Sequence, residues 1–135
     1  MENTTQSQPV IHPWVYVWRV DSDKTNYRRS ISPRYIIDMV SRYYITKGIS
    51  LSSPVLFGPS RKSMYVVPRY MMWYFIYKYS AKQSLKSIGM IFNRDHSTVI
   101  NGIKRLKNYC ETEPQTRQML NDLCTLLKVD EYGTP

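Results

Sequence analysis

The chain has 135 residues, the length of one domain, and a core of that size can be stable without disulfides or bound metal. Nineteen lysine and arginine residues against ten acidic residues give a formal net charge of +9, which favours a polyanionic partner. No apolar run approaches the roughly 20 residues that cross a bilayer, and no signal segment opens the chain, so we expect a cytoplasmic protein with no membrane partner.

The positive charge is concentrated in the middle of the chain. Between Arg28 and Lys107 there are fifteen basic residues and only two acidic ones, Asp38 and Asp95, whereas acidic residues outnumber basic ones outside that window. Such segregation is typical of proteins that bind a polyphosphate, because each neutralised phosphate releases condensed counterions. The alternative is a basic surface that serves solubility only, although such a surface usually interleaves both signs.

Residues 1–30 are expected to form a polar N-terminal extension, interrupted by an aromatic strip over Trp14–Val20. The β-branched and aromatic residues of the strip suit an edge strand, a segment packed over the core, or a segment ordered by a protein partner or by self-association. Of these we expect packing on the core. The helical domain is expected over residues 31–128, followed by a C-terminal tail over 129–135.

The helical domain opens with Ser32-Pro33, a capping residue before a proline in the first helical position. Apolar residues then recur on one helical face, and Gly48 ends the helix. That face comprises Ile36, Val40, Tyr43 and Tyr44. Residues 49–67 contain so many helix breakers that they are predicted to form a basic loop.

Four more helices are predicted downstream. The first runs over about 68–79 and is apolar on nearly every side, so it belongs at the centre of a bundle, with its methionines and aromatic residues filling the core. Ser84 caps a short helix that ends at Phe92, another helix covers about 95–109, and a last one follows Pro114. The predicted fold class is therefore all-α, a compact bundle of about five helices.

The segment Ser87–Ile103 has the pattern of a helix-turn-helix, with the turn at Asn93-Arg94 and with Gly89 permitting close approach of the second helix. The second helix begins with hydrogen-bonding side chains and continues with apolar ones at spacings of four and three. The polar tip comprises Arg94, Asp95, His96, Ser97 and Thr98, and the apolar stripe comprises Val99, Ile103 and Leu106. Taken singly, Asp95 would be a simple helix cap and His96 a solvated histidine, but together beside a basic loop they favour a DNA-reading tip.

The stretch from about Ser32 to Asn108 resembles the C-terminal DNA-binding domain of the bacterial replication initiator DnaA. The resemblance rests on Pro68-Arg69 at the central helix, on the run Ser84-Leu85-Lys86-Ser87-Ile88-Gly89, and above all on Arg94-Asp95-His96-Ser97-Thr98-Val99. It implies binding of a nine-base-pair duplex site, the DnaA box. In this family the helix-turn-helix enters the major groove and an arginine of the basic loop enters the minor groove.

The resemblance assigns two kinds of site residue. Base reading falls to Asp95, His96 and Ser97 in the major groove and to Arg61 in the minor groove. Phosphate contacts fall to Lys62, Arg69, Lys78, Arg94 and Thr98. The chemistry suits these roles, because a carboxylate accepts from the amino group of cytosine or adenine and an arginine is attracted by a narrow A·T-rich minor groove.

The chain also departs from the family pattern. A single Asn93 stands where the family usually has two glycines, and an extra residue around Ala81 to Gln83 compensates for the missing one. Serine stands at position 97 where many members have threonine, so the preferred DNA sequence is expected to differ. The run Gly58 to Ser63 lacks the second glycine of a phosphate loop, which predicts that the family's ATPase module is absent and that no nucleotide is bound.

We therefore expect a stand-alone, sequence-specific DNA-binding protein of a bacterial or phage-infected cell, acting in replication initiation or its regulation. It would have no cofactor and no catalytic residues, because its two histidines and scattered acids form no metal-type cluster. Cys110 and Cys124 fall on apolar helix faces without zinc-ligand spacing, so both are expected to be reduced core thiols. The alternatives are a transcriptional regulator, or a nucleic-acid-associated structural protein of a phage or mobile element that docks through Trp14–Val20.

Overall fold

The computed structural model describes residues 30–59 and 62–129, and within them it contains helices and no strand. The six helices are α2 (Pro33–Thr46), α3 (Ser53–Phe57), α4 (Ser63–Tyr79), α5 (Leu85–Phe92), α6 (His96–Thr112) and α7 (Pro114–Leu127). The predicted all-α class is confirmed for this part of the chain. The aromatic strip Trp14–Val20 lies outside the described residues, so its predicted packing on the core stays a prediction.

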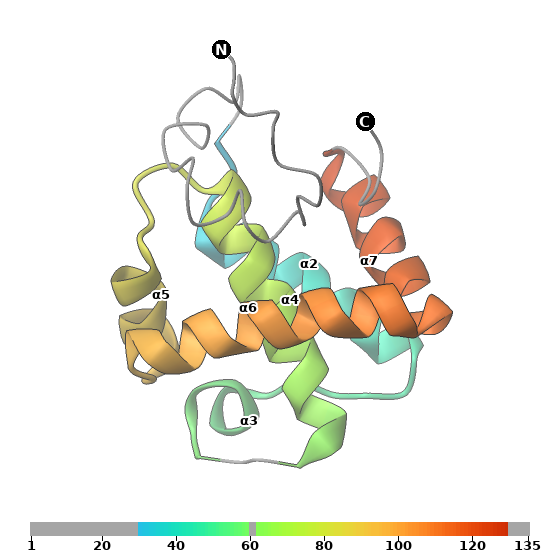
Figure 1. Ribbon diagram of the computed structural model, residues 1–135, viewed down its shortest axis with the longest axis horizontal. Coiled ribbons are helices and arrows are strands. Elements are labelled where there is room, and N and C mark those ends of the chain that lie inside the picture. The colour runs from blue at the N-terminus through green and yellow to red at the C-terminus, as the bar shows by residue number, and fades with distance from the viewer. Residues whose placement is uncertain (1–29, 60–61, 130–135) are drawn as a thin grey trace, which may run out of the picture.

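Helix α4 is the centre of the bundle, as its sequence predicts. Helix α6 lies across it and α2 packs behind it, while α5 and α7 lie against the two ends of α6 (Figure 1). Because neighbours surround α4 from Pro68 onward, its side chains there are buried in nearly every direction rather than along one stripe. Its fully buried side chains include Met71, Met72, Trp73, Phe75 and Ile76.

The helix ends follow the capping residues that the sequence provides. Ser32 Oγ accepts a hydrogen bond from the Tyr35 amide at 3.2 Å, and α2 is followed by Gly48 with a φ of +83°. In α5, the Ser87 amide donates to Ser84 Oγ at 3.1 Å while the Ser84 amide donates to Ser87 Oγ at 2.8 Å. These reciprocal bonds satisfy two amides that the first helical turn leaves without intrahelical partners.

Helix α6 begins with Asp95 as its cap. The Asp95 carboxylate accepts the Thr98 amide at 3.0 Å and the Thr98 hydroxyl at 2.6 Å, both through Oδ1. These bonds, the hydroxyl first, lower the pKa of Asp95 below its usual value, because they favour the charged carboxylate. The helix extends to Thr112, three residues beyond the predicted end at Tyr109.

The predicted basic loop over residues 49–67 is wrong in its extent. Residues Ser53–Phe57 form α3, and α4 begins at Ser63 rather than at Pro68. Pro54 lies in the first turn of α3, where a missing amide hydrogen has no consequence. Pro68 lies inside α4 and removes only the one hydrogen bond that would reach the carbonyl of Met64.

Both cysteines are free and buried, which confirms the prediction of reduced core thiols. Burial raises the pKa of the Cys110 thiol to about 11. None of the described helices combines the length and the apolar character that crossing a bilayer requires.

The crossing of α4 and α6 is close because position 102 carries no side chain. A Cβ on Gly102 would lie 2.5 Å from Cζ3 of Trp73 and 2.7 Å from Cδ1 of Tyr70. Non-bonded carbon atoms do not approach one another so closely, so any larger residue at position 102 forces the two helices or the rings to move. Residue 102 therefore sets the separation of the two longest helices.

We predict that Gly102→Ala lowers the free energy of unfolding by about 1–3 kcal/mol, since overpacking outweighs the roughly 1 kcal/mol that alanine gains over glycine in a helix. Urea denaturation followed by circular dichroism measures the change. Asn108→Ala, an exposed position on the same helix, is the matched control and should stay within about 0.5 kcal/mol of the parent. A Gly102→Ala protein as stable as the control would contradict the packing described for this crossing.

We predict that the stability difference between the parent protein and Asp95→Asn depends on pH. Asparagine also caps helices but does not titrate, whereas the Asp95 carboxylate has a lowered pKa in the folded state. Its extra stabilisation is present above the unfolded aspartate pKa of about 3.9 and is lost as the pH falls through the lower folded value. Urea denaturation of both proteins at several pH values tests this, and a difference that does not change with pH would refute it.

Candidate nucleic-acid interface

The helix-turn-helix predicted from the sequence is present as α5, a short turn and α6. Asn93 takes a left-handed conformation with φ +58° and ψ +46°, and the Arg94 amide then donates to the Gly89 carbonyl at 2.7 Å. A Cβ on Gly89 would lie 2.3 Å from the Arg94 carbonyl oxygen, so the glycine is what allows this tight turn. The prediction that Gly89 permits close approach is confirmed.

The polar tip projects from the first turn of α6. Asp95, His96, Ser97 and Thr98 are all exposed, while Val99 directly behind them is fully buried. The structure therefore brings the three predicted major-groove readers together on one surface. Asp95 serves as the helix cap through Oδ1, which leaves Oδ2 for a ligand. The reading roles of these residues stay predictions.

A cleft of about 910 Å³ lies beside the tip, between α6 and the first half of α4. The described residues that line it include three arginines, Arg69, Arg94 and Arg105, and no acidic residue. From α6 the lining residues are Thr98, Asn101, Gly102, Arg105 and Tyr109. This composition creates a positive potential that suits an anionic strand.

Sequence reasoning missed three of the residues that line this cleft, Asn101, Arg105 and Tyr109. The signal was available, because they follow Thr98 at intervals of three or four and so share one helical face. That face adjoins the buried stripe of Val99, Ile103 and Leu106.

Two predicted phosphate residues, Arg69 and Arg94, contact main-chain carbonyls inside the protein. Arg69 is only 4% exposed and its Nη1 donates to the Val55 carbonyl at 3.0 Å. Arg94 donates from Nη2 to the Gly58 carbonyl at 2.6 Å and from Nη1 to the Phe92 carbonyl at 2.9 Å. Burial lowers the pKa of the Arg69 guanidinium, and the nearby charge of Arg94 lowers it further. These contacts give both arginines a structural role, and their phosphate contacts stay predictions.

The remaining predicted residues are spread along α4. Lys62 is exposed and is the cap residue of α4, next to the cleft. Lys78 lies at the other end of that helix, with its ammonium 5.8 Å from the centre of the Tyr74 ring. Lys78 is nine positions beyond Arg69 along the helix, a rise of roughly 14 Å, so it lies far from the cleft beside the tip that Arg69 lines. Arg61 lies outside the described residues.

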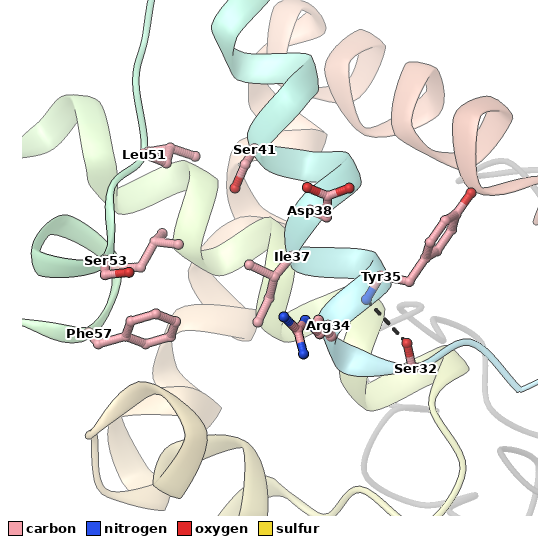
Figure 2. A pocket seen from close by; sticks show the side chains of 10 residues that line it. Ser32, Arg34, Tyr35, Ile37, Asp38, Ser41, Leu51, Ser53 and Phe57 are labelled. Carbon is pink, nitrogen blue, oxygen red and sulfur yellow. Dashed lines mark hydrogen bonds between the residues drawn. The ribbon is translucent and has the colours of Figure 1, made fainter.

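A second cavity, of about 610 Å³, lies between α2 and α3. Figure 2 shows Ile37 of α2 and Phe57 of α3 on different sides of it, with Arg34 at its edge. The described residues of its lining mix apolar and polar side chains, with no histidine or cysteine among them. Across the described ranges, no three histidine, cysteine or acidic side chains gather in a way that could hold a metal ion.

Comparison with known proteins places this geometry in a family. A family model described as the bacterial dnaA protein helix-turn-helix matches residues 33–106, which include α2 to most of α6. The chain is 33% identical over 99 residues to the chromosomal replication initiator protein DnaA of Flavobacterium psychrophilum, covering 73% of this chain and 20% of the relative. It is 37% identical over 81 residues to DnaA 1 of Chlamydia pneumoniae, covering 60% of this chain and 16% of the relative.

The chain thus spans a fifth or less of the length of these two relatives. No solved structure matched it significantly. The matched region contains the features that make up the candidate interface, namely the turn at Asn93, the polar tip and most of the arginine-lined cleft. On this match the chain belongs to the family of the bacterial DnaA helix-turn-helix.

Proposed function

We propose that this protein binds duplex DNA in a sequence-specific manner, at a site like the DnaA box, in replication initiation or its regulation. The observation that carries the proposal is the exposed polar tip of α6 beside a cleft whose described lining has three arginines and no acidic side chain. Family membership supports the same ligand. The protein acts in this proposal by binding alone, in the cytoplasm, without a nucleotide or other cofactor.

The tip suits the major groove in both size and chemistry. A helix with its side chains is about 10–12 Å across, and the major groove of B-DNA is about 12 Å wide. Oδ2 of Asp95 would accept from the amino group of cytosine or adenine, and His96 and Ser97 would bond to base edges. Since the Asp95 side chain is held by two bonds to Thr98, it would meet the base with little further loss of conformational freedom.

The flanking strand would lie along the cleft. Thr98 and Arg105 are exposed in the cleft and Lys62 is exposed at the start of α4, and these three are the proposed phosphate contacts. Arg61, which precedes Lys62, is the proposed minor-groove arginine. The resemblance also implies phosphate contacts by Arg69, Arg94 and Lys78. Their side chains lie against Val55, Gly58 and the Tyr74 ring, so we give the exposed residues the larger share of the binding.

Selection of bound duplexes from a random library, followed by fluorescence anisotropy, tests the proposal. The enriched duplex should bind roughly 10³-fold more tightly than a scrambled duplex of the same composition at physiological salt. Equal affinity for the two duplexes would defeat the proposal of sequence-specific binding. Enrichment of a motif unrelated to the DnaA box would retain DNA binding but remove the proposed site.

We predict that His96→Ala weakens binding to the enriched duplex by about 1–3 kcal/mol and relaxes the preference at one base pair. The loss reflects a base contact, so the scrambled duplex should be affected much less. Gln115→Ala, exposed on α7, is the control and should change neither affinity. If both duplexes weaken equally in His96→Ala, His96 does not read a base.

We predict that Lys62→Ala weakens binding to all duplexes alike and lowers the slope of log affinity against log salt by about one, because one phosphate contact is lost. Anisotropy titrations at four or more salt concentrations measure the slope. Arg42→Ala removes a positive charge from the exposed surface of α2 and is the charge-matched control, with an unchanged slope. An unchanged slope in Lys62→Ala would remove Lys62 from the interface.

A further inference from the structure

We propose that Arg94 is a positioning residue that ties the reading tip to the loop between α3 and α4, and that sequence discrimination depends on this tie rather than on a phosphate contact by Arg94. The inference rests on the proposed function, since it assigns a role within the same interface. It differs from the resemblance, which places Arg94 at the rim of the groove as a phosphate ligand.

The guanidinium of Arg94 joins two backbone segments that are distant in sequence. Nη2 donates to the carbonyl of Gly58, 36 residues away, and Nη1 donates to the carbonyl of Phe92 at the end of α5. A guanidinium is planar and its donors have fixed directions, so bonds to two main-chain acceptors fix one backbone relative to the other. The residue that follows Arg94 is Asp95, the first fully exposed residue of the polar tip and the cap of α6.

Helix α3 needs such contacts to hold its position. It has five residues, too few to be stable as an isolated helix. Its Phe57 ring lies 5.3 Å from the ring of Phe92, and its Val55 carbonyl accepts from Arg69 at 3.0 Å. Two guanidinium groups therefore meet the C-terminal carbonyls of α3, where the helix dipole attracts positive charge.

The tie matters because Gly58 is where the loop begins. Gly58 caps the end of α3, and the chain from there leads to Lys62 at the start of α4. Lys62, proposed to contact a DNA phosphate, and Asp95 and His96, proposed to contact bases, must bind the same duplex at the same time. Binding groups need to be held to within about 0.5 Å of their working geometry, and among the described residues Arg94 hydrogen-bonds to both the loop end and the helix-turn-helix.

Arg105 offers a contrast on the same cleft. It is exposed and makes no hydrogen bond or ion pair with another residue of the described ranges, so its guanidinium is available to a phosphate. Arg94 is partly buried and its donors point to carbonyls. The two arginines carry the same charge, but Arg94 holds the backbone in place and Arg105 is proposed to contact a phosphate.

Paired substitutions in the full chain test the proposal. Arg94→Lys keeps the charge but cannot reproduce the two fixed bonds, so the ratio of affinities for the enriched and scrambled duplexes should fall about tenfold with an unchanged salt slope. Arg105→Lys should leave the ratio unchanged. Arg94→Gln should also leave the slope unchanged, whereas Arg105→Gln should lower it by about one. An unaltered ratio in Arg94→Lys, or a slope that falls by one in Arg94→Gln, would overturn the proposal.

Amide hydrogen exchange without DNA supplies a second readout. The Leu56 and Gly58 amides donate to the carbonyls of Ser52 and Pro54 within α3. If Arg94 holds this helix, both amides should exchange about tenfold faster in Arg94→Lys, with amides of α7 unchanged. Unchanged exchange at Leu56 and Gly58 would overturn the proposed tie. Equal binding of both duplexes by the parent protein would instead overturn the proposed function, while exchange would still decide whether Arg94 positions α3.

Discussion

The contact of α6 with α4 at Gly102 is the constraint on which the rest of the structure depends. With no side chain at this position, the two longest helices cross at a separation set by the rings of Trp73 and Tyr70. The buried stripe of α6 then fits against the central helix, which fixes the rotation of α6 about its own axis. Once that rotation is fixed, the polar tip must face outward and the arginine-lined cleft must form on the adjoining face.

Several side chains at the candidate interface stabilise the fold. Asp95 caps α6 with one carboxylate oxygen, and the other is left for the proposed base contact. Arg69 and Arg94 supply positive potential to the cleft while their donors hold the carbonyl end of α3. A substitution at one of these positions would therefore lower DNA binding both by destabilising the fold and by removing a contact. At His96, Ser97 and Arg105, which project into solvent from α6, the two effects are easier to separate.

Much of the fold could be predicted because its signals are local. Helix ends are set by residues that bond within three or four positions of themselves, and the helix-turn-helix could be predicted from such residues. They are Ser32-Pro33, Ser84, Asn93 and Asp95. Residues 49–67 could not be predicted, since Pro54, Gly58 and Pro59 are helix breakers by residue type and Pro68 is typical of a helix start. Helix α3 forms because Leu56 and Phe57 pack on the core and because Arg69 and Arg94 bond to carbonyls at its end. The resemblance assigns phosphate contacts to Arg69 and Arg94, because the sequence shows that a side chain is charged but not where its guanidinium points. Their acceptors, Val55 and Gly58, lie 14 and 36 residues away.

The short turn at Asn93 has a consequence for how such a domain can change over time. Because the core face of α6 is locked against α4, a residue inserted into or deleted from this turn cannot rotate His96 or Ser97 away from their present directions. It would instead alter the path of the chain through Arg94, and with it the reach from that side chain to Gly58. Length variation in the turn thus offers a route by which related domains could shift the loop contacts while the residues proposed to read bases keep the same orientation.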